Sequence, residues 1–477
     1  MPVFTKLQRL TIALTSVVIG IAAIACIDGS AVTKDAAQNV RMGVNLAHHG
    51  LISINRNEPY RASMYREPLP IAVDAVAVAV TDSLLGAAPY TEYLYGERVK
   101  IIKFQNVLWL LLLWAAVLSA TRWFTRSPNA AILAGLIAVL PFLSRSSIEA
   151  VNNLYTELPA AALLGWAATT LAVAASDRSG WKFAAAGLCF GLLALAKASF
   201  LYVFLGLVLL LACTFLRSPG DWRRHSLHAA LLVAAFAAFV LPWIGRNVHA
   251  FGQAQISERG GLAIYTRALM NQLSRDEYRG TFYIWARPAL QPLVGSLLGF
   301  TPADLGPGGR LERLNTDPGT EHYDRDLAAE LAGKPEEAVT FYRRGRAERE
   351  WLDAQYQREG AADSEVAADR ALAKLGMDMV KSDFRDDLEL TIPLLWRSAP
   401  IMFPALVLAL GFALWRRDDA LLLYAFPGTA YLLFYALATP FEPRPASIAR
   451  ALTVVAVVAV IQSLCRSASF GSRAPAK

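Results

Sequence analysis

The sequence predicts an all-α protein: a polytopic bundle of about ten transmembrane helices, with both termini cytoplasmic and with interfacial helices and a helical segment on the outer face. Hydrophobic residues make up 55% of the 477 residues and charged residues only 18%, against about 25% in ordinary soluble proteins. A mean hydropathy of +0.36 excludes a disordered chain and argues against a soluble enzyme. Clusters of lysine and arginine in short loops supply the third observation, because all of them fall on one side of the predicted membrane.

Ten apolar runs are candidates for membrane helices, which need about 20 apolar residues each. Lys6 and Arg9 precede the first run, a pattern that cleavable signal peptides share. Nine further runs favour a retained anchor. The ten runs lie near residues 9–27, 102–121, 129–147, 157–175, 182–197, 200–216, 227–244, 398–415, 419–437 and 449–465.

The basic loops predict the direction of each helix, because lysine and arginine accumulate in short cytoplasmic loops. Alternating helices place six basic clusters on one side, whereas Arg145 and Lys197 are single basic residues that fall on the other. We therefore expect the two termini in the cytoplasm and the loop 28–101 outside. The clusters are Lys6 and Arg9; Arg122 and Arg126; Arg178 and Lys182; Arg217, Arg223 and Arg224; Arg416 and Arg417; and Arg466, Arg473 and Lys477.

Three parts follow from this topology. Residues 1–244 form an N-terminal transmembrane module with the outer loop 28–101, residues 245–397 form an extracytoplasmic and mainly helical segment, and residues 398–477 form the C-terminal transmembrane helices. If the cell is bacterial, the protein lies in the inner membrane with its outer loops in the periplasm or at the cell exterior.

Two outer stretches have a predicted conformation. Pro68–Leu85 is apolar but contains Asp74 and Asp82, so we expect an interfacial helix that lies on the membrane. The stretch from Lys334 to Leu388 is charged and helical in pattern, which is typical of a solvated face.

The net charge of +7 does not indicate nucleic-acid binding. Between Arg246 and Leu390 there are 19 basic and 24 acidic residues, a net charge of −5, so the rest of the chain carries +12 in its short loops. A nucleic-acid-binding protein would have its basic residues clustered on one face, not distributed over short loops between apolar runs. The four cysteines form no CxxC pair, which argues against a disulfide framework or a zinc knuckle.

Acidic residues open two helices on the predicted outer side. Asp35 stands at the start of a helical stretch, where it could be an N-cap or a catalytic carboxylate. Glu157 opens the fourth apolar run, where the helix dipole favours a carboxylate. An ionisable group at a membrane border is also a candidate functional residue.

Basic residues with aromatic or amide neighbours flank two other helices. Tyr65-Arg66 precedes the interfacial helix, where a guanidinium could bind a phosphate at headgroup level or extend to the membrane surface as an ordinary arginine does. Arg246-Asn247 ends the seventh run after Pro242-Trp243.

The sequence has no nucleotide-binding motif and no clear metal site. The six histidines form no carboxylate–histidine spacing typical of zinc. A Walker A loop, a Rossmann glycine pattern and a GxSxG elbow are all absent from the sequence.

In their order along the chain, these elements resemble the GT-C class of polytopic glycosyltransferases, in particular the bacterial enzymes related to protein O-mannosyltransferases and the lipid A aminoarabinose transferase. Asp35, followed by Asn45-Leu46-Ala47 and Gly50, resembles the acidic first outer loop of that class. Arg66–Pro70 resembles its basic-Pro-Pro element, with Glu67 in place of the first proline. Glu157 resembles the second acidic residue, which opens the fourth span.

The second half of the resemblance lies around the fifth and seventh spans. Pro242-Trp243 with Arg246-Asn247 and Phe251-Gly252 is the closest match to the class. Gly191–Lys197 resembles a signature that usually ends in Thr-Arg-Pro, but here it ends in Ala-Lys-Ala. This departure leaves Lys197 without a predicted role.

The resemblance implies a glycosyltransferase that takes a sugar from a polyprenyl-phosphate donor on the outer face of the membrane. The implied acceptor is a glycan, a lipid or a protein of the cell envelope. Asp35 and Glu157 would be the catalytic residues, and Tyr65, Arg66, Arg246 and Asn247 would bind substrate. Some members of the class need a divalent metal, so a metal is possible, although the sequence offers no ligand set for one.

Two other functions fit the composition. A transporter or lipid flippase would show repeats and broken helices near mid-membrane, whereas the runs here are mostly uninterrupted. A non-catalytic membrane scaffold would use the outer segment 303–388 to bind a partner. Loss of activity on Asp35→Asn with normal folding would separate an enzyme from a scaffold.

Overall fold

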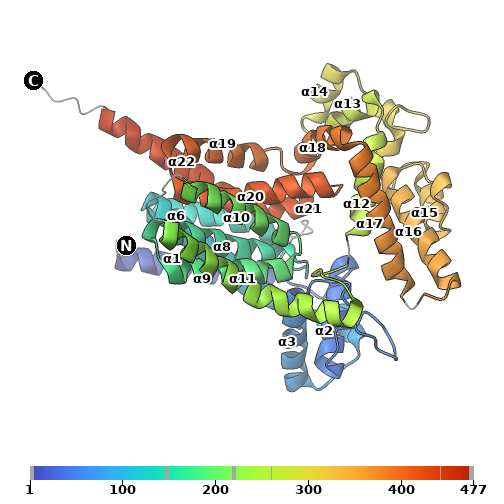
Figure 1. Ribbon diagram of the computed structural model, residues 1–477, viewed down its shortest axis with the longest axis horizontal. Coiled ribbons are helices and arrows are strands. Elements are labelled where there is room, and N and C mark those ends of the chain that lie inside the picture. Colours follow the sequence, from blue (N-terminus) through green and yellow to red (C-terminus); the bar gives the residue numbers. More distant parts are fainter. Residues whose placement is uncertain are drawn as a thin grey trace, which may run out of the picture. The chain divides into compact units, whose positions relative to one another are not determined.

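The computed structural model describes residues 5–144, 150–216, 222–258, 260–361, 363–440 and 442–471, and this part of the chain is helical without a β-strand. The predicted all-α fold is therefore confirmed (Figure 1). Four residues of the predicted basic clusters and loops, Arg145, Arg217, Arg473 and Lys477, lie outside the described residues.

The chain forms two compact units, each assembled from separate segments. The first unit comprises Met1–Ser257, Ile401–Tyr431 and Ala446–Lys477, and the second comprises Glu258–Pro400 and Leu432–Pro445. C-terminal segments thus belong to both units.

The first unit contains most of the apolar helices. Its N-terminal part has α1 (Lys6–Cys26), α2 (Lys34–His49), α3 (Pro68–Leu85), α4 (Tyr90–Leu94), α5 (Val99–Lys103), α6 (Gln105–Thr125), α7 (Pro128–Val139), α8 (Glu157–Asp177), α9 (Gly180–Ala196), α10 (Phe200–Leu216) and α11 (Trp222–Phe251). Its C-terminal helices are α19 (Met402–Arg416) and α22 (Arg450–Gly471), and α20 (Asp419–Ala438) continues from the first unit into the second at Leu432. The short helix α21 (Pro443–Ala446) belongs to the second unit except for its last residue.

Each of the ten predicted apolar runs contains a helix within the described residues, but the helices differ in length. Seven helical segments of the described chain are long and apolar enough to cross a membrane, or eight if Phe384–Ser398 and Met402–Arg416 count as one broken span. Three predicted runs form shorter apolar helices, Pro128–Leu143, Gly180–Ala196 and Phe200–Thr214. The protein is therefore an integral, multi-pass membrane protein.

Helix α3 is one of the seven long apolar helices, although its sequence pattern predicts an interfacial helix. Its mean hydropathy is 1.6 in spite of Asp74 and Asp82, because the alanines, valines and leucines between them dominate. The side chain of Asp74 is buried and accepts a hydrogen bond from Gln105 at 2.8 Å. Packing of α3 against Gln105 of α6 thus buries a carboxyl group that the sequence pattern predicts to be exposed.

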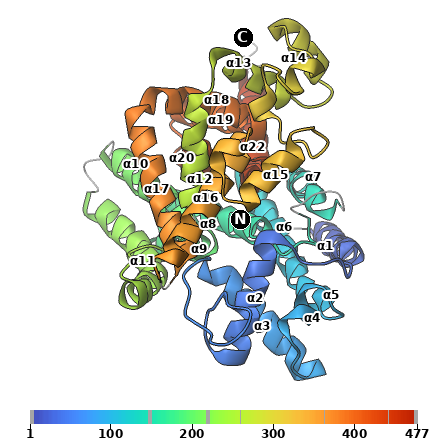
Figure 2. The ribbon, with the colours of Figure 1, turned by 90° about the vertical axis from the view of Figure 1, so that its right-hand side faces the viewer.

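Helices α2 and α3 pack closely in the first unit, as Figures 1 and 2 both show. A Cβ atom at Gly43 of α2 would lie 2.7 Å from the Cβ of Asp74, a distance that only glycine permits. Val40, Val78 and Tyr93 belong to one buried apolar cluster that joins α2, α3 and α4. This packing fixes α2 relative to the residues that precede α3.

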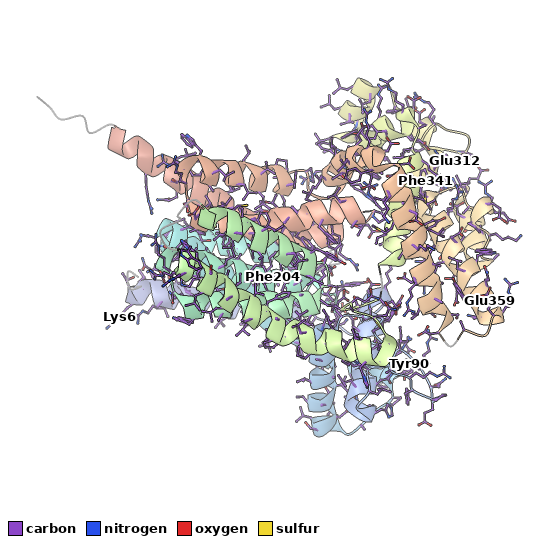
Figure 3. The ribbon with its side chains drawn as sticks, in the orientation of Figure 1. Lys6, Tyr90, Phe204, Glu312, Phe341 and Glu359 are labelled. Atoms are coloured by element: carbon purple, nitrogen blue, oxygen red, sulfur yellow. The ribbon has the colours of Figure 1, made fainter. Side chains whose placement is uncertain are left out.

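The second unit is built from shorter and more polar helices. It contains α12 (Gly261–Leu269), α13 (Arg275–Ile284), α14 (Gln291–Leu298), α15 (Tyr323–Leu331), α16 (Phe341–Arg358), α17 (Ser364–Ser382) and α18 (Phe384–Ser398). Figure 3 labels Phe341 and Glu359 at the two ends of α16. The charged stretch predicted from Lys334 to Leu388 is indeed helical in α16, α17 and the start of α18.

Helix α12 packs against α17 through a glycine contact. A Cβ at Gly261 would lie 1.8 Å from the carbonyl oxygen of Asp369. The Asp369 carboxylate accepts hydrogen bonds from the amides of Gly261 and Leu262, at 3.0 and 3.1 Å. These bonds satisfy amides at the start of α12 that have no partner within the helix.

Candidate active site

Asp35 lies in the first turn of α2, and it is not the N-cap of that helix. The N-cap is Thr33, and Asp35 is the second helical residue. Its side chain is about a quarter exposed, so the carboxylate is accessible while the helix dipole favours its charge. The alternative that Asp35 is the N-cap is therefore wrong, because the N-cap Thr33 lies two residues earlier.

Arg66 immediately precedes the N-cap of α3 and is almost completely buried. Its Nη2 atom lies 3.6 Å from Oδ1 of Asp35, which makes an ion pair. Within the described part of the chain, the buried Nε and Nη2 atoms of Arg66 have no hydrogen-bond acceptor. A buried donor without an acceptor costs about 1–3 kcal/mol, so these two nitrogens can take a further acceptor in addition to the Asp35 carboxylate.

Glu157 and Lys197 form a buried ion pair. Glu157 is the first residue of α8 and is only 1% exposed, and Lys197 ends α9 as its C-cap. The Lys197 Nζ atom lies 3.1 Å from Oε1 of Glu157. Burying an isolated charge costs far more than burying a pair. Each of these two residues therefore stabilises the buried charge of the other.

Glu67 connects these two ion pairs electrostatically. It is the N-cap residue of α3, and its carboxylate accepts a hydrogen bond from the amide of Ala198 at 3.5 Å. Burial raises the pKa of Glu67 above its ordinary value, Lys197 opposes this rise, and the negative charge of Asp35 adds to it. The carboxyl group of Glu67 is therefore near both Asp35 and Lys197.

Arg246, five residues before the end of α11, contacts the same loop. Its Nη1 atom donates to the carbonyl of Ser63 at 3.2 Å and to Oδ1 of Asn247 at 2.8 Å. The guanidinium lies over the rings of Trp243 and Phe251, with distances of 4.7 and 5.0 Å to the ring centroids. Stacking on two rings fixes the plane of the cation.

Asn247 holds the chain that follows α11. It is fully buried, and its Nδ2 atom donates to the carbonyls of Gln255 and Ile256, at 2.8 and 3.2 Å. Trp243 also donates to the carbonyl of Ile256 through Nε1, at 2.8 Å. The Pro-Trp and Arg-Asn elements of the sequence therefore form one local structure that orients Arg246.

The structure brings together most of the residues predicted for the site. Asp35 and Arg66 are paired directly, Glu157 joins them through Lys197 and Glu67, and Arg246 contacts the loop three residues before Arg66. Tyr65 is half-buried beside Arg66.

Glu67 and Lys197 are the site residues that sequence reasoning missed. In the sequence, Glu67 is only a departure from the basic-Pro-Pro pattern, and Lys197 is only a departure from Thr-Arg-Pro. The available signal was a lysine at the end of an apolar helix, on the same predicted side as Glu157. A charge in that place needs a buried partner, and Glu157 is that partner.

The described residues offer no evident ligand set for a divalent metal. The described residues contain no group of three or more His, Cys, Asp or Glu side chains that could hold a metal ion. The charged neighbour of Asp35 is the guanidinium of Arg66, which repels a cation at that carboxylate. We therefore derive no step through a metal.

The fold and these contacts define an integral membrane protein with a buried site of acidic and basic side chains next to helices α2 and α3. No family model matches the chain, and no curated protein matches it.

Solved structures show a distant similarity. The chain is similar to the archaeal oligosaccharyltransferase AglB from Archaeoglobus fulgidus in complex with an inhibitory peptide and a dolichol-phosphate, with 14% identity, a TM-score of 0.45, and coverage of 99% of this chain and 53% of that one. For an oligosaccharyltransferase of the same organism in complex with Zn and sulfate, the values are 16%, 0.47, 95% and 49%. For ArnT from Cupriavidus metallidurans bound to undecaprenyl phosphate, they are 15%, 0.38, 97% and 79%.

These neighbours are GT-C glycosyltransferases, the class that the sequence motifs resemble. The chain spans about half the length of the two archaeal structures. At such identities and TM-scores the similarity is too distant to assign an activity to this chain.

Proposed function

We propose that this protein is a membrane glycosyltransferase that transfers a sugar from a polyprenyl-phosphate-linked donor to an acceptor of the cell envelope. The reaction takes place on the outer face of what we take to be a bacterial inner membrane. The acceptor is a glycolipid, a polysaccharide or a protein.

The observation that carries this proposal is the state of Arg66. Its guanidinium is buried, two of its nitrogens have no acceptor within the described residues, and the carboxylate of Asp35 lies 3.6 Å away. A phosphate group provides acceptors for a planar guanidinium in a bidentate geometry. A lipid phosphate suits a cation that directly precedes an apolar helix such as α3.

Asp35 is the general base in this proposal. The acceptor's hydroxyl or amine attacks the anomeric carbon of the donor sugar, and the bond from that carbon to the phosphate oxygen breaks. The proton of the acceptor passes to the Asp35 carboxylate, while the sugar goes through an oxocarbenium-like transition state. The leaving lipid phosphate keeps the electron pair of the broken bond and so gains a second negative charge, which a cation stabilises without a proton.

The remaining residues position these groups. Arg246 is oriented by its stacking on Trp243 and by Asn247, and it provides a second cation for the donor. The Glu157–Lys197 pair fixes the end of α9 against the start of α8. Through Lys197 and Glu67, this pair influences the electrostatics of Asp35.

Transfer by the purified protein tests the proposal. Full-length protein in detergent is incubated with polyprenyl-phosphate sugars and candidate acceptors, and products are detected by mass spectrometry. Envelope glycans of cells with and without the gene product identify which acceptors to use. We expect transfer from a lipid-linked sugar, and none from the same sugar linked to a nucleotide. Unchanged envelope glycans together with no binding of polyprenyl phosphate would refute the proposed function.

The predicted sidedness has its own test. In a background without native cysteines, a single cysteine at the exposed Ser176, at the end of α8, should be protected from an impermeant thiol reagent in intact cells. A cysteine at the exposed Glu359 in the second unit should react with the reagent. Equal reactivity at both positions would contradict an outward-facing site.

A further inference from the structure

The second unit contains a cavity of about 270 Å³ that the proposed transfer reaction does not use. Residues of α12, α15, α16 and α18 line it, together with the segment around Arg313 and with Pro440 and Glu442. Its volume is close to the lower end of the roughly 300–1,000 Å³ that is typical of small-ligand sites. The cavity therefore has room for one or two rings of a small ligand.

Three arginine–aromatic pairs distinguish the lining of this cavity. The guanidinium of Arg313 lies 4.6 Å from the ring centroid of Phe341, which is labelled in Figure 3. The corresponding distance is 4.9 Å both for Arg343 over Tyr323 and for Arg397 over Trp285. Three planar guanidinium groups, each stacked on an aromatic ring, thus line one cavity.

Groups behind the lining hold these arginines in place. Arg313 donates from Nε and Nη2 to the buried Glu277, at 2.7 and 2.5 Å. Arg343 donates to the buried Glu330. The hydrogen bond of Arg397 is to a neutral acceptor, the carbonyl of Pro440, at 3.0 Å from Nη1.

The lining itself carries net positive charge. Its charged members are the three arginines and Glu442, which is exposed. An arginine has five N–H donors in a rigid fork, and the carbonyl of Pro440 takes one of those of Arg397. The cavity therefore offers immobilised cations that match a carboxylate or a phosphate.

We propose that this cavity binds an anionic saccharide. The anionic group pairs with Arg397 and its neighbouring guanidinium groups, and the apolar faces of the sugar ring lie against Trp285, Tyr323 or Phe341. Aromatic side chains provide large rigid contact areas at low entropic cost, and sugar rings have apolar C–H faces that suit them. A neutral sugar would provide no charged acceptor for the N–H groups of Arg397, whose hydrogen bond in the structure is to a backbone carbonyl.

The acidic saccharide is the recognised part of the acceptor glycan. This assignment of the ligand as acceptor depends on the proposed function, whereas the binding itself does not. Recognition of the acceptor would then belong to the second unit, while the chemistry belongs to residues of the first.

Binding to the full-length protein in detergent tests the proposal without any transfer reaction. The probes are an oligosaccharide that contains a uronic acid, the same oligosaccharide with its carboxyl group reduced, and a hexose phosphate. We expect at least one anionic probe to bind about tenfold or more tightly than the neutral probe, because hydrogen bonds to charged groups contribute strongly. The tighter anionic probe identifies the anion as carboxylate or phosphate.

Variants locate the binding in the cavity. Arg397→Gln should weaken binding of the anionic probe by about 10- to 100-fold. Thr316→Trp should abolish it, because Thr316 lines the cavity, is exposed and can accept a large side chain. The matched control is Arg310→Gln, since Arg310 also stacks on an aromatic ring, Phe300 at 4.8 Å, but does not line the cavity.

Three results would overturn the proposal: equal affinity for anionic and neutral probes, no binding of any probe, or unchanged binding by Thr316→Trp. An equal loss with Arg310→Gln would also overturn it, because that variant leaves the cavity intact. Binding to an Asp35→Asn variant should match the wild type. If that variant also transferred sugar normally, the proposed base would be refuted while the saccharide site remained established.

Discussion

Two buried arginines, one in each unit, differ in how their guanidinium groups are satisfied. In the second unit, Arg267 donates to the carbonyls of Ala436 and Asp387, at 3.1 and 2.5 Å, and to Oδ1 of Asn271 at 2.8 Å. Its Nη1 also lies 3.0 Å from the carboxylate of Asp387. In the first unit, two nitrogens of Arg66 have no acceptor among the described residues.

The difference separates a structural arginine from one that is arranged for a ligand. Burial lowers the pKa of Arg267 to about 10, and the charge of Asp387 opposes this effect. The full set of acceptors compensates for the burial of Arg267, so this residue stabilises the second unit. Arg66 is buried without that compensation, and a site that binds an anion gains affinity from such a pre-positioned cation.

The largest expected effect concerns Asp35, the carboxylate beside the unsatisfied arginine. Asp35→Asn should reduce the rate of transfer by roughly 10²–10⁴-fold, because an amide cannot accept the acceptor's proton. Asp35→Glu should also retain little activity, because a displacement of about 1 Å can cost ~10²-fold. Transfer is measured on membranes normalised to protein level.

A control and a contrary result belong to the same measurement. The Asn variant should reach the membrane in normal amounts, since Thr33 and not Asp35 is the N-cap of α2. Full transfer by Asp35→Asn would exclude Asp35 as the base, and Glu67 or Glu157 would then need the same test.

The next largest effect is on stability, and it contrasts the two arginines directly. Arg267→Met should destabilise the protein by about 3–5 kcal/mol, because it leaves the buried Asp387 without its partner. Arg66→Met should change stability by less than about 1 kcal/mol, because two nitrogens of Arg66 lack acceptors and its ion-pair partner Asp35 stays partly exposed to solvent. Thermal unfolding in detergent compares the two variants, and equal destabilisation would contradict the distinction.

For binding of the donor, we expect the larger effect from substitution of Arg66 and the smaller effect from substitution of Arg267. Arg66→Ala should weaken binding of polyprenyl phosphate by about 10- to 100-fold, as expected for loss of charge-assisted hydrogen bonds. Arg66→Lys should lose less, since it keeps the charge but not the planar fork. Arg267→Gln is the matched control and should bind normally in the fraction that folds. An Arg66→Ala variant with unaltered affinity would show that the cation does not contact the phosphate.

The smallest expected effect is a pH dependence at Glu67. Burial raises the pKa of its carboxyl group in the folded protein above the ordinary value of 4.5. The stabilisation by the protonated form is therefore complete below the unfolded pKa and is lost as pH rises toward the folded pKa. Glu67→Gln should melt like the wild type near about pH 4 and at higher temperature than the wild type near about pH 7. A difference in melting temperature that does not change with pH would contradict this.

Several elements could be predicted from the sequence because local physics determines them. The apolar run before Asp177 predicts a membrane helix, and α8 has it. The turn after α2 is also local, since Gly50 adopts a positive φ of 67° at the helix end, as glycine does at many helix C-termini. The order of Asp35, Arg66, Glu157 and Arg246 along the chain predicts a set of candidates, but not their contacts.

Other features depend on contacts between distant segments. The pattern of α3 predicts a helix on the membrane surface, and it does not predict that the Asp74 side chain is buried and accepts a hydrogen bond from Gln105, 31 residues later in the chain. The position of Lys197 indicates a need for a buried partner, but which residue it is depends on tertiary packing, because Glu157 lies 40 residues earlier. No periodicity of the sequence encodes such a pairing.

The sequence by itself determined that the chain is helical, that it is a multi-pass membrane protein and that charged residues stand at the ends of its apolar helices. Hydropathy, helix capping and side-chain volume act over a few residues, so they can be read from the chain directly. Only the tertiary structure decided which charges meet: Asp35 with Arg66, Glu157 with Lys197, and three arginines with three rings around the cavity of the second unit. The physical reason is that a buried charge is stable only beside a partner, and long-range packing selects that partner.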